Sequence, residues 1–240
     1  MCLIAFAYKH HPRYPLILAA NRDEFRDRLA LQAHFWDDHP QVLAGRDLKA
    51  GGTWLGISRS GRFAALTNHR DFRRTPVQGP SRGLLVKEAL LHAVNAQASP
   101  MEGYNLIQGH IDALRYQSNI NGADEPLLPG VHGLSNALLN TPWPKVNRAV
   151  EAMRNATAGP IPDTAALFGM LADGEHATDD ELPDTGLDLH RERALSSIRI
   201  DLPGYGTRCS TVIMVHESGR VRFEERTWPT GHAVIEEFTI

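Results

Sequence analysis

The feature that most constrains the fold of this sequence is the position of its short apolar runs, which gather near the two ends of the chain. Residues 2–8 and 15–20 are separated by a polar segment that contains proline, a pattern typical of two strands joined by a loop. Residues 53–58 and 62–68 flank a short turn that contains Gly61, which is typical of antiparallel strands. The N-terminal part of the chain therefore predicts two hairpins.

A meander of three strands is predicted at the C-terminus, over residues 208–217, 220–228 and 232–240, with weaker strand candidates at 104–110 and 113–119. Helical periodicity is strongest between these blocks, and the expected helices are residues 84–96, 145–156 and 164–171. Strands at both ends with helices between them favour antiparallel sheets covered by helices. We therefore expect an α+β fold rather than alternating βαβ units.

Length and composition predict one globular domain that spans residues 1–240, since 42% of the residues are apolar and 22% are charged. The acidic segment at residues 172–188 is poor in apolar residues and contains Pro183, so we expect an exposed loop or lid there. The two cysteines, Cys2 and Cys209, are expected to be free thiols of a cytoplasmic protein.

Several classes of partner are excluded by the same counts. The 25 Lys and Arg residues against 28 Asp and Glu give a net charge of −3, which leaves no basic excess for nucleic acid. No apolar run approaches the roughly 20 residues that a membrane helix needs, so no membrane span is expected. Because HExxH, CxxC, P-loop and GxGxxG motifs do not occur in the sequence, we predict neither a metal site nor a cofactor.

The first hairpin predicts a polar cluster around Cys2. If Tyr8 pairs with Pro15, the numbers of paired residues sum to about 23, and Cys2 lies opposite Asn21. The far end of the hairpin then combines Cys2 with Asn21, Arg22, Asp23 and Glu24.

Three other polar elements are candidates for the same site. In the second hairpin a register sum of about 119 sets Asn68 opposite Gly51 and Gly52, next to Trp54. Two further polar clusters lie at loop edges, and they contain Asn136 and Arg208.

These residue types fit acyl transfer. Removal of Met1 leaves a thiol and a free α-amine on Cys2, and the amine has a reference pKa of about 7.7–8.0, so it can act as base for the thiol. The donors that an oxyanion needs are available from the side chain of Asn68 or Asn136, or from the backbone of Gly51 and Gly52. Arg22 or Arg208 can hold the thiolate or a substrate carboxylate.

Each candidate also has a purely structural interpretation. Cys2 fits a small buried residue at the start of an edge strand, and residues 21–24 fit a charged strand exit with surface ion pairs. The elements around Gly51, Gly52 and Asn68 fit turn and edge features. Arg208 fits an ordinary surface arginine.

Several motifs taken together resemble the NRDE family, also called the transport and Golgi organisation family. The resemblance covers nearly the whole chain except residues 172–202. The motifs that carry it are MCLIAFAY, ANRDEF, HFWDD, LAGRD with GGTWLGI, GRFAALTN, GLSNALLNTPWPK and YGTRCST.

That family is in turn similar to N-terminal nucleophile (Ntn) hydrolases of the cysteine type, such as penicillin V acylase and bile-salt hydrolase. The resemblance implies a four-layer αββα sandwich with Cys2 as nucleophile. It also implies an Arg and an acidic residue from the ANRDEF run, namely Arg22 with either Asp23 or Glu24. The remaining positions that it implies are Asn68, Asn136 with Asn140 as a rival, and Arg208.

Two functions follow as hypotheses. The first is an Ntn-type hydrolase or acyltransferase that acts on a small amide, thioester or related acyl compound through Cys2. The second, which rests on the resemblance alone, is a non-catalytic protein that binds haem or a lipid in the same cleft.

Overall fold

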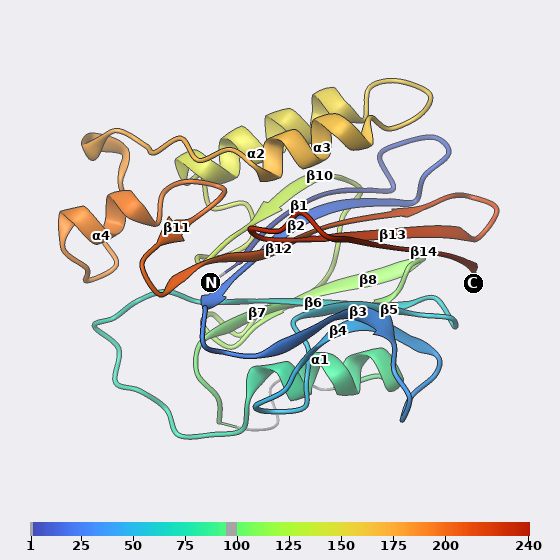
Figure 1. Cartoon of the computed structure of the whole chain (residues 1–240), viewed down its shortest axis with the longest axis horizontal. Coiled ribbons are helices and arrows are strands. Elements are labelled where there is room, and N and C mark those ends of the chain that lie inside the picture. Colours follow the sequence, from blue (N-terminus) through green and yellow to red (C-terminus); the bar gives the residue numbers. More distant parts are fainter. Residues whose placement is uncertain (1, 95–99) are drawn as a thin grey trace.

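Two seven-stranded antiparallel sheets lie face to face in the computed structural model, which describes residues 2–94 and 100–240 (Figure 1). The first sheet contains, in order, β10 (Gly130–Leu134), β1 (Cys2–Tyr8), β2 (Leu16–Phe25), β12 (Tyr205–Val215), β13 (Arg220–Thr227) and β14 (Ala233–Thr239), with β11 (Asp201–Leu202) paired to β12. The second contains β3 (Ala30–Phe35), β4 (Val42–Asp47), β5 (Leu55–Ser58), β6 (Arg62–Asn68), β7 (Tyr104–His110), β8 (Ala113–Ser118) and β9 (Asp124–Pro126).

Helices cover the outer face of each sheet. Helices α2 (Pro144–Ala156) and α3 (Thr164–Leu171) pack on the first sheet, and α1 (Arg82–Leu91) packs on the second (Figure 1). The short elements η2 (Asp179–Glu181) and α4 (Leu189–Ala194) follow α3 in the chain. The fold is therefore α+β with four layers in the order αββα, as predicted.

The position of β1 between two apolar layers explains why its sequence is a continuous apolar run. All seven of its residues are buried. Ile4, Phe6 and Tyr8 face the core between the sheets, whereas Leu3 and Ala5 face the helices, because successive side chains of a strand point to opposite faces. Full burial of a large apolar side chain contributes about 1.5–3 kcal/mol, so β1 is a main source of stability.

Strand β2 is longer than its apolar run indicates. The sequence predicts an end at residue 20, but β2 continues through Asn21, Arg22, Asp23 and Glu24 to Phe25, because β12 pairs with it over this whole length. The polar residues that follow the apolar run are thereby held in a regular ladder. Tertiary pairing has overridden the local sequence signal.

Other expectations were met in part. Helices α2 and α3 agree with prediction, and α1 begins two residues early and ends at Leu91. Residues 95 and 96 of that expected helix lie outside the described residues. The loop expected at 172–188 is largely exposed, yet Ala177 and Thr185 are buried. Among the described residues, no helix combines the length and apolar character needed to cross a bilayer.

The loop between β4 and β5 packs tightly against the start of α1. The backbone N–H of Thr53 donates to the carbonyl oxygen of Gly83 at 3.1 Å. A Cβ atom at position 52 would lie 2.4 Å from the carbonyl carbon and oxygen of Gly83. Glycine is therefore required at position 52 for close backbone packing.

We expect Gly52→Ala to lower the free energy of unfolding by about 1–3 kcal/mol, because the added methyl group forces apart two backbone segments. Urea unfolding followed by circular dichroism measures the change. Gly174→Ala is the matched control, since a Cβ atom there meets nothing within 4 Å. Equal stability of the two variants would contradict this account of the contact.

Candidate functional site

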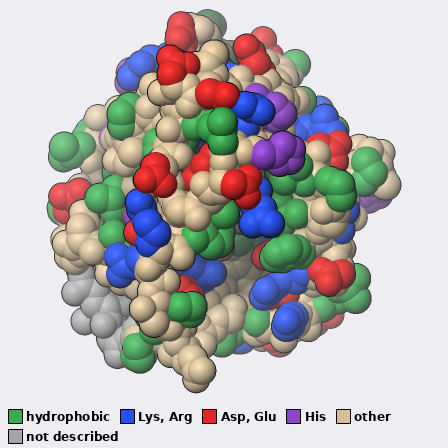
Figure 2. Space-filling view, turned by 90° about the vertical axis from the view of Figure 1, so that its left-hand side faces the viewer, with side chains coloured by type: hydrophobic (Ala, Val, Ile, Leu, Met, Phe, Trp, Pro, Cys, Tyr) green, Lys and Arg blue, Asp and Glu red, His purple; other side chains and the backbone are tan. Residues whose placement is uncertain are grey.

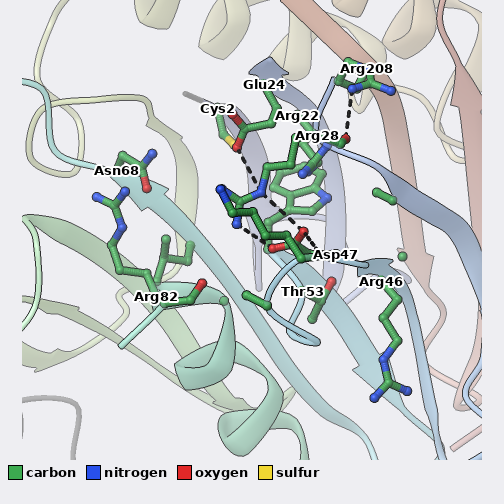
Figure 3. Close-up of a pocket in the computed structure, with 18 of the residues that line it drawn as sticks. Cys2, Arg22, Glu24, Arg28, Arg46, Asp47, Thr53, Asn68, Arg82 and Arg208 are labelled. Carbon is green, nitrogen blue, oxygen red and sulfur yellow. Dashed lines mark hydrogen bonds and ion pairs between the residues drawn. The ribbon is translucent and has the colours of Figure 1, made fainter. Parts of the chain in front are cut away.

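A cavity of about 530 Å³ lies at the end of the molecule where β1 begins. Its walls come from both sheets and from the start of α1, and its lining includes Cys2, Arg22, Trp54, Asn68 and Arg208 (Figure 3). The face of the molecule that Figure 2 shows is hollowed, and basic side chains lie beside the hollow. The topology thus brings distant polar motifs of the sequence to one cavity.

The register of the first hairpin differs by one residue from the predicted one. Tyr8 pairs with Leu16, so Cys2 lies opposite Arg22 rather than Asn21. The physical reason is that the loop closes between Lys9 and Pro15, where the backbone N–H of Lys9 donates to the carbonyl oxygen of Pro15 at 2.8 Å. Pro15 has no N–H to return this bond, so the regular ladder begins with Tyr8 and Leu16. A shift of one residue changes which side chains share a face.

As a result, Cys2, Arg22 and Glu24 share the face between the sheets, whereas Asn21 and Asp23 point toward the helices. Asn21 therefore lies outside the cavity lining. Its Nδ2 donates to the carbonyl oxygens of Leu171 and Ile198 at 2.8 and 3.0 Å, and these bonds tie the helical layer to the sheet.

Asp23 lies next to Cys2 but on the helix side of the strand. The hydroxyl of Thr207 donates to its Oδ1 at 2.7 Å. Burial raises the pKa of Asp23, and the nearby positive charge of Lys145 acts in the opposite direction. Burial likewise raises the pKa of the Cys2 thiol, and the charge of Asp23 adds to this increase, whereas Arg22 counteracts it.

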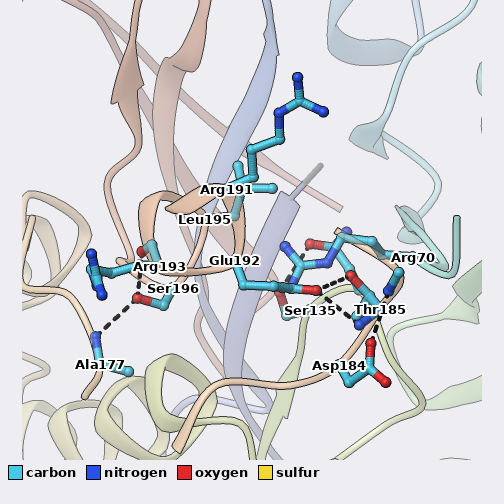
Figure 4. A network of polar contacts seen from close by, with 12 residues as sticks. Arg70, Ser135, Ala177, Asp184, Thr185, Arg191, Glu192, Arg193, Leu195 and Ser196 are labelled. Carbon is cyan, nitrogen blue, oxygen red and sulfur yellow. Dashed lines mark hydrogen bonds and ion pairs between the residues drawn. The ribbon is translucent and has the colours of Figure 1, made fainter. Parts of the chain in front are cut away.

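Figure 4 shows a buried ionic group that contains Arg70 and Glu192. Lys145 links this group electrostatically to Cys2 and Asp23. Arg70 and Glu192 form an ion pair at 2.9 Å, and their side chains are only 2% and 4% exposed. Glu192 also accepts a hydrogen bond from the backbone N–H of Thr185 at 2.8 Å. The segment predicted to be a lid is thus anchored to the interior, and none of its described residues lines the cavity.

Lys145, at the start of α2, belongs to the same group. Its Nζ donates to the carbonyl oxygen of Leu195 at 2.9 Å, and the side chain is buried. Burial, together with the nearby charge of Arg70, lowers the pKa of Lys145 to about 8.

Glu24 is held on the cavity wall by Arg28. The Arg28 guanidinium lies 3.9 Å from Glu24 and 2.6 Å from Asp47, so it joins β2 to β4 across the cavity (Figure 3). The two acidic candidates of the ANRDEF run therefore have different surroundings. Asp23 is a buried neighbour of Cys2, whereas Glu24 is part of an ion-pair group on the wall.

Arg208 occupies a bulge in β12, between Thr207 and Cys209. A bulge re-aims the side chain of the extra residue. The Nη1 of Arg208 donates to the carbonyl oxygens of Phe25, Arg26 and Arg28 at 2.8–3.2 Å. Arg208 thus lines the cavity while it fixes the chain between β2 and β3.

Asn68 ends β6 and faces the cavity on the side opposite Arg208 (Figure 3). Within the described ranges, its side-chain amide has no hydrogen-bond partner. Its backbone oxygen accepts from Nδ2 of Asn136 at 2.9 Å. Asn136 is fully buried behind this wall, and the neighbouring Ser135 hydroxyl donates to the carbonyl oxygen of Cys2 at 3.2 Å.

The second hairpin also has a register different from the predicted one. Leu55 pairs with Ala65, which gives a sum of 120, and β5 begins only at Leu55. Gly51 and Gly52 therefore lie in a loop outside the cavity lining, whereas Trp54 lines it. The rival Asn140 uses its Oδ1 to accept from the N–H of Gly133 at 3.0 Å, and it also lies outside the lining.

Sequence reasoning missed several residues of the cavity. Arg82 and Glu225 line it, and Cys209, predicted only as a free thiol in the strand at 208–217, lies opposite Arg22 on the same wall. Burial raises the pKa of Glu225. The only signals in the sequence were a basic residue two positions before a predicted helix and an acidic residue inside the predicted C-terminal meander. Across residues 2–94 and 100–240, no three His, Cys, Asp or Glu side chains gather as metal ligands would.

The family model described as Transport and Golgi organisation 2 (TANGO2) matches residues 1–230. The chain belongs to this family. The TANGO2 relatives include the Transport and Golgi organization protein 2 homolog of Bos taurus, 37% identical over 95% of this chain and 93% of the relative. The Homo sapiens homolog is 36% identical with the same coverage, and the Drosophila melanogaster protein is 28% identical over 95% of this chain and 92% of its own.

Solved structures confirm the fold of this TANGO2 family member as similar to that of Ntn hydrolases. A Caenorhabditis elegans N-acylethanolamine-hydrolyzing acid amidase ortholog superposes with a TM-score of 0.50 and 10% identity, covering 88% of this chain and 92% of its own. The C2A mutant of conjugated bile acid hydrolase from Clostridium perfringens gives the same TM-score and identity over 99% of this chain and 92% of its own.

The buried lysine predicts a pH dependence of stability. Folded Lys145 loses its proton near pH 8, whereas an unfolded lysine keeps it to about pH 10.4. Between these values the unfolded chain binds more protons, so rising pH favours the folded state through this residue. We expect the free energy of unfolding of the wild type to rise by about 3 kcal/mol relative to Lys145→Met between pH 7 and 10.5. Urea unfolding of both proteins across this pH range measures the difference in the free energy of unfolding. Parallel pH profiles of the wild type and Lys145→Met would contradict the prediction.

Proposed function

We propose that this chain is an Ntn-type cysteine hydrolase or acyltransferase that acts on a small amide, thioester or related acyl compound through Cys2, once Met1 has been removed. The observation that carries the proposal is the meeting of three groups in one cavity. Cys2 lies beside Arg22 on one strand pair, and the free amide of Asn68 faces the same cavity from the other sheet.

The nucleophile needs a base. Because burial raises the pKa of Cys2, its thiol is mainly protonated near neutral pH. With Met1 removed, the α-amine of Cys2 accepts the thiol proton while the sulfur attacks the acyl carbon. The positive charge of Arg22 stabilises the thiolate. The amine then gives the proton to the leaving group, and water or another acceptor cleaves the thioester.

We assign the acidic role to Asp23 rather than Glu24. Asp23 lies directly behind Cys2, is fixed by Thr207, and acts electrostatically on the thiol. A carboxylate in this place orients the α-amine and stabilises its protonated form. Glu24 already interacts with Arg28 and stabilises the wall.

Asn68 is the proposed oxyanion donor. Its amide faces the cavity, and the bond from Asn136 to its backbone oxygen fixes the end of β6. The side chain is therefore pre-positioned, and a donor of this kind stabilises the charge that develops on the carbonyl oxygen. Trp54 lies in the same lining and offers an apolar surface for the acyl group.

The alternative, a carrier of haem or lipid in the same cleft, has no specific observation in its favour. Binding of haem or a lipid by this chain, combined with no acylation of Cys2 in the following experiment, would favour this alternative.

We expect incubation of the mature protein with 4-nitrophenyl acetate to add one acetyl group to Cys2, detected by intact-mass spectrometry and peptide mapping. Cys2→Ala removes the acyl adduct, because the attacking sulfur is lost. Cys209→Ala is the matched thiol control and retains it. Acylation of Cys2→Ala at the wild-type rate, or a protein that keeps Met1 in cells, would refute the proposal.

We further expect Asn68→Ala to lower kcat by about 10²–10³-fold with a smaller effect on KM, because the lost donor acts mainly in the transition state. Steady-state hydrolysis of the same ester measures both constants. Asn121→Ala, at an exposed turn, is the control. A change confined to KM would assign Asn68 to ground-state binding instead.

A further inference from the structure

The cavity lining carries one more basic than acidic side chain, six against five. The basic residues are Arg22, Arg28, Arg46, Lys49, Arg82 and Arg208. Of these, Lys49 is exposed to solvent. Three of its arginines are held by an ion pair or by several hydrogen bonds. Arg28 pairs with Asp47 at 2.6 Å, Arg46 donates to Asp38 at 2.8 Å, and Arg208 is held by three carbonyl oxygens. These three arginines are held in place by the wall itself, although only Nη1 of Arg208 is engaged in these bonds.

Arg22 and Arg82 differ from them. In the described part of the chain, Arg22 has no hydrogen-bond or ion-pair partner, and Arg82 has a single hydrogen bond, from its Nη1 to the carbonyl oxygen of Gly103 at 3.0 Å. The nearby Glu102 accepts instead from the backbone N–H of Val77 at 2.8 Å. Two guanidinium groups therefore face the cavity without a bonded carboxylate.

Both groups are partly removed from water. Each side chain is half-buried, and burial lowers the pKa of Arg82. Glu102 and Glu24 act on Arg82 only through space, without a hydrogen bond in the described part of the chain. Glu225 acts on Arg22 in the same way. Desolvation of a charged group that lacks a directly bonded counter-ion destabilises the folded state, so an anion that forms such bonds in the cavity would offset this cost. The first turn of α1 holds no acidic residue, which leaves its positive end open to the same anion.

The position of Arg82 relates this anion to the proposed chemistry. Arg82 rises from the start of α1 toward the side chain of Asn68 (Figure 3). Arg22 approaches from the strand next to Cys2. The two guanidinium groups thus lie on the walls that also carry the proposed nucleophile and oxyanion donor.

We propose that Arg82, together with Arg22, binds an anionic group of the substrate on the Asn68 side of the cavity, so that the substrate is an acyl compound that carries a carboxylate or a phosphate. This inference rests on the proposed function. The planar fork of arginine matches both of these anions through paired charge-assisted hydrogen bonds.

The first experiment tests the anion site without catalysis. Glutarate and inorganic phosphate are titrated separately by calorimetry into Cys2→Ala protein, alone and combined with Arg82→Gln or Lys87→Gln. We expect at least one anion to bind, and Arg82→Gln to weaken it by about tenfold or more, because a hydrogen bond to a charged group is lost. Lys87→Gln removes the same charge from the same helix outside the cavity lining and leaves binding unchanged.

The second experiment uses the intact nucleophile. Mono-4-nitrophenyl glutarate carries a carboxylate, and 4-nitrophenyl butyrate is its neutral counterpart. We expect the wild type to prefer the glutarate ester in kcat/KM, and Arg82→Gln to reduce this preference by about tenfold with little change for the butyrate ester. Arg82→Lys keeps the positive charge but loses the planar guanidinium group, so we expect an intermediate preference for the glutarate ester. This variant replaces Arg82→Gln in the comparison if Arg82→Gln unfolds at a much lower temperature than the wild type.

The two experiments separate the two proposals. If neither ester is hydrolysed, the proposed function is overturned, and the titrations still decide whether the anion site exists. If neither anion binds, or if the Arg82→Gln and Lys87→Gln variants bind equally well, the anion site is overturned even when both esters are hydrolysed. Loss of phosphate binding alone identifies a phosphate-bearing substrate, and loss of glutarate binding alone identifies a carboxylate.

Discussion

The pairing of β2 with β12 is the interaction on which the rest of the site depends. It extends β2 from the apolar run into the polar residues Arg22 and Asp23, which a free chain would leave in a loop. The bulge in β12 directs the side chain of Arg208 toward carbonyl oxygens at the end of β2 and in the segment after it, beginning with that of Phe25. Without this ladder, the cavity would lack one wall and Cys2 would lack its charged neighbours.

The alternation of strand side chains then divides the chemistry between two environments. Arg22 points into the solvent-accessible cavity, whereas Asp23 points into a buried group that includes Lys145 and the Arg70–Glu192 pair. A single strand thus presents a cation to a ligand and an anion to the protein interior. In the proposed mechanism the first stabilises the thiolate and the second orients the amine.

Much of the fold could be predicted because its signals are local. Apolar runs, turns and helical periodicity depend on neighbouring residues, and they placed β1, β6, α2 and α3 well. The predicted register was wrong because it depends on where the loop closes, and closure between Lys9 and Pro15 instead of Tyr8 and Pro15 shifts the pairing of the whole strand. Arg82 could not be predicted as a cavity residue, since its place depends on how a helix of one layer packs against loops of another.

The tight contact between Gly52 and Gly83 has a consequence for how the cavity can change shape. It joins the β4–β5 loop to the start of α1, so the segments that carry Trp54 and Arg82 pack directly against each other. Adjustment to ligands of different size is therefore expected from side-chain rotation and from the exposed segment with Val77 and Gly79 that completes the lining, not from separation of these two packed segments.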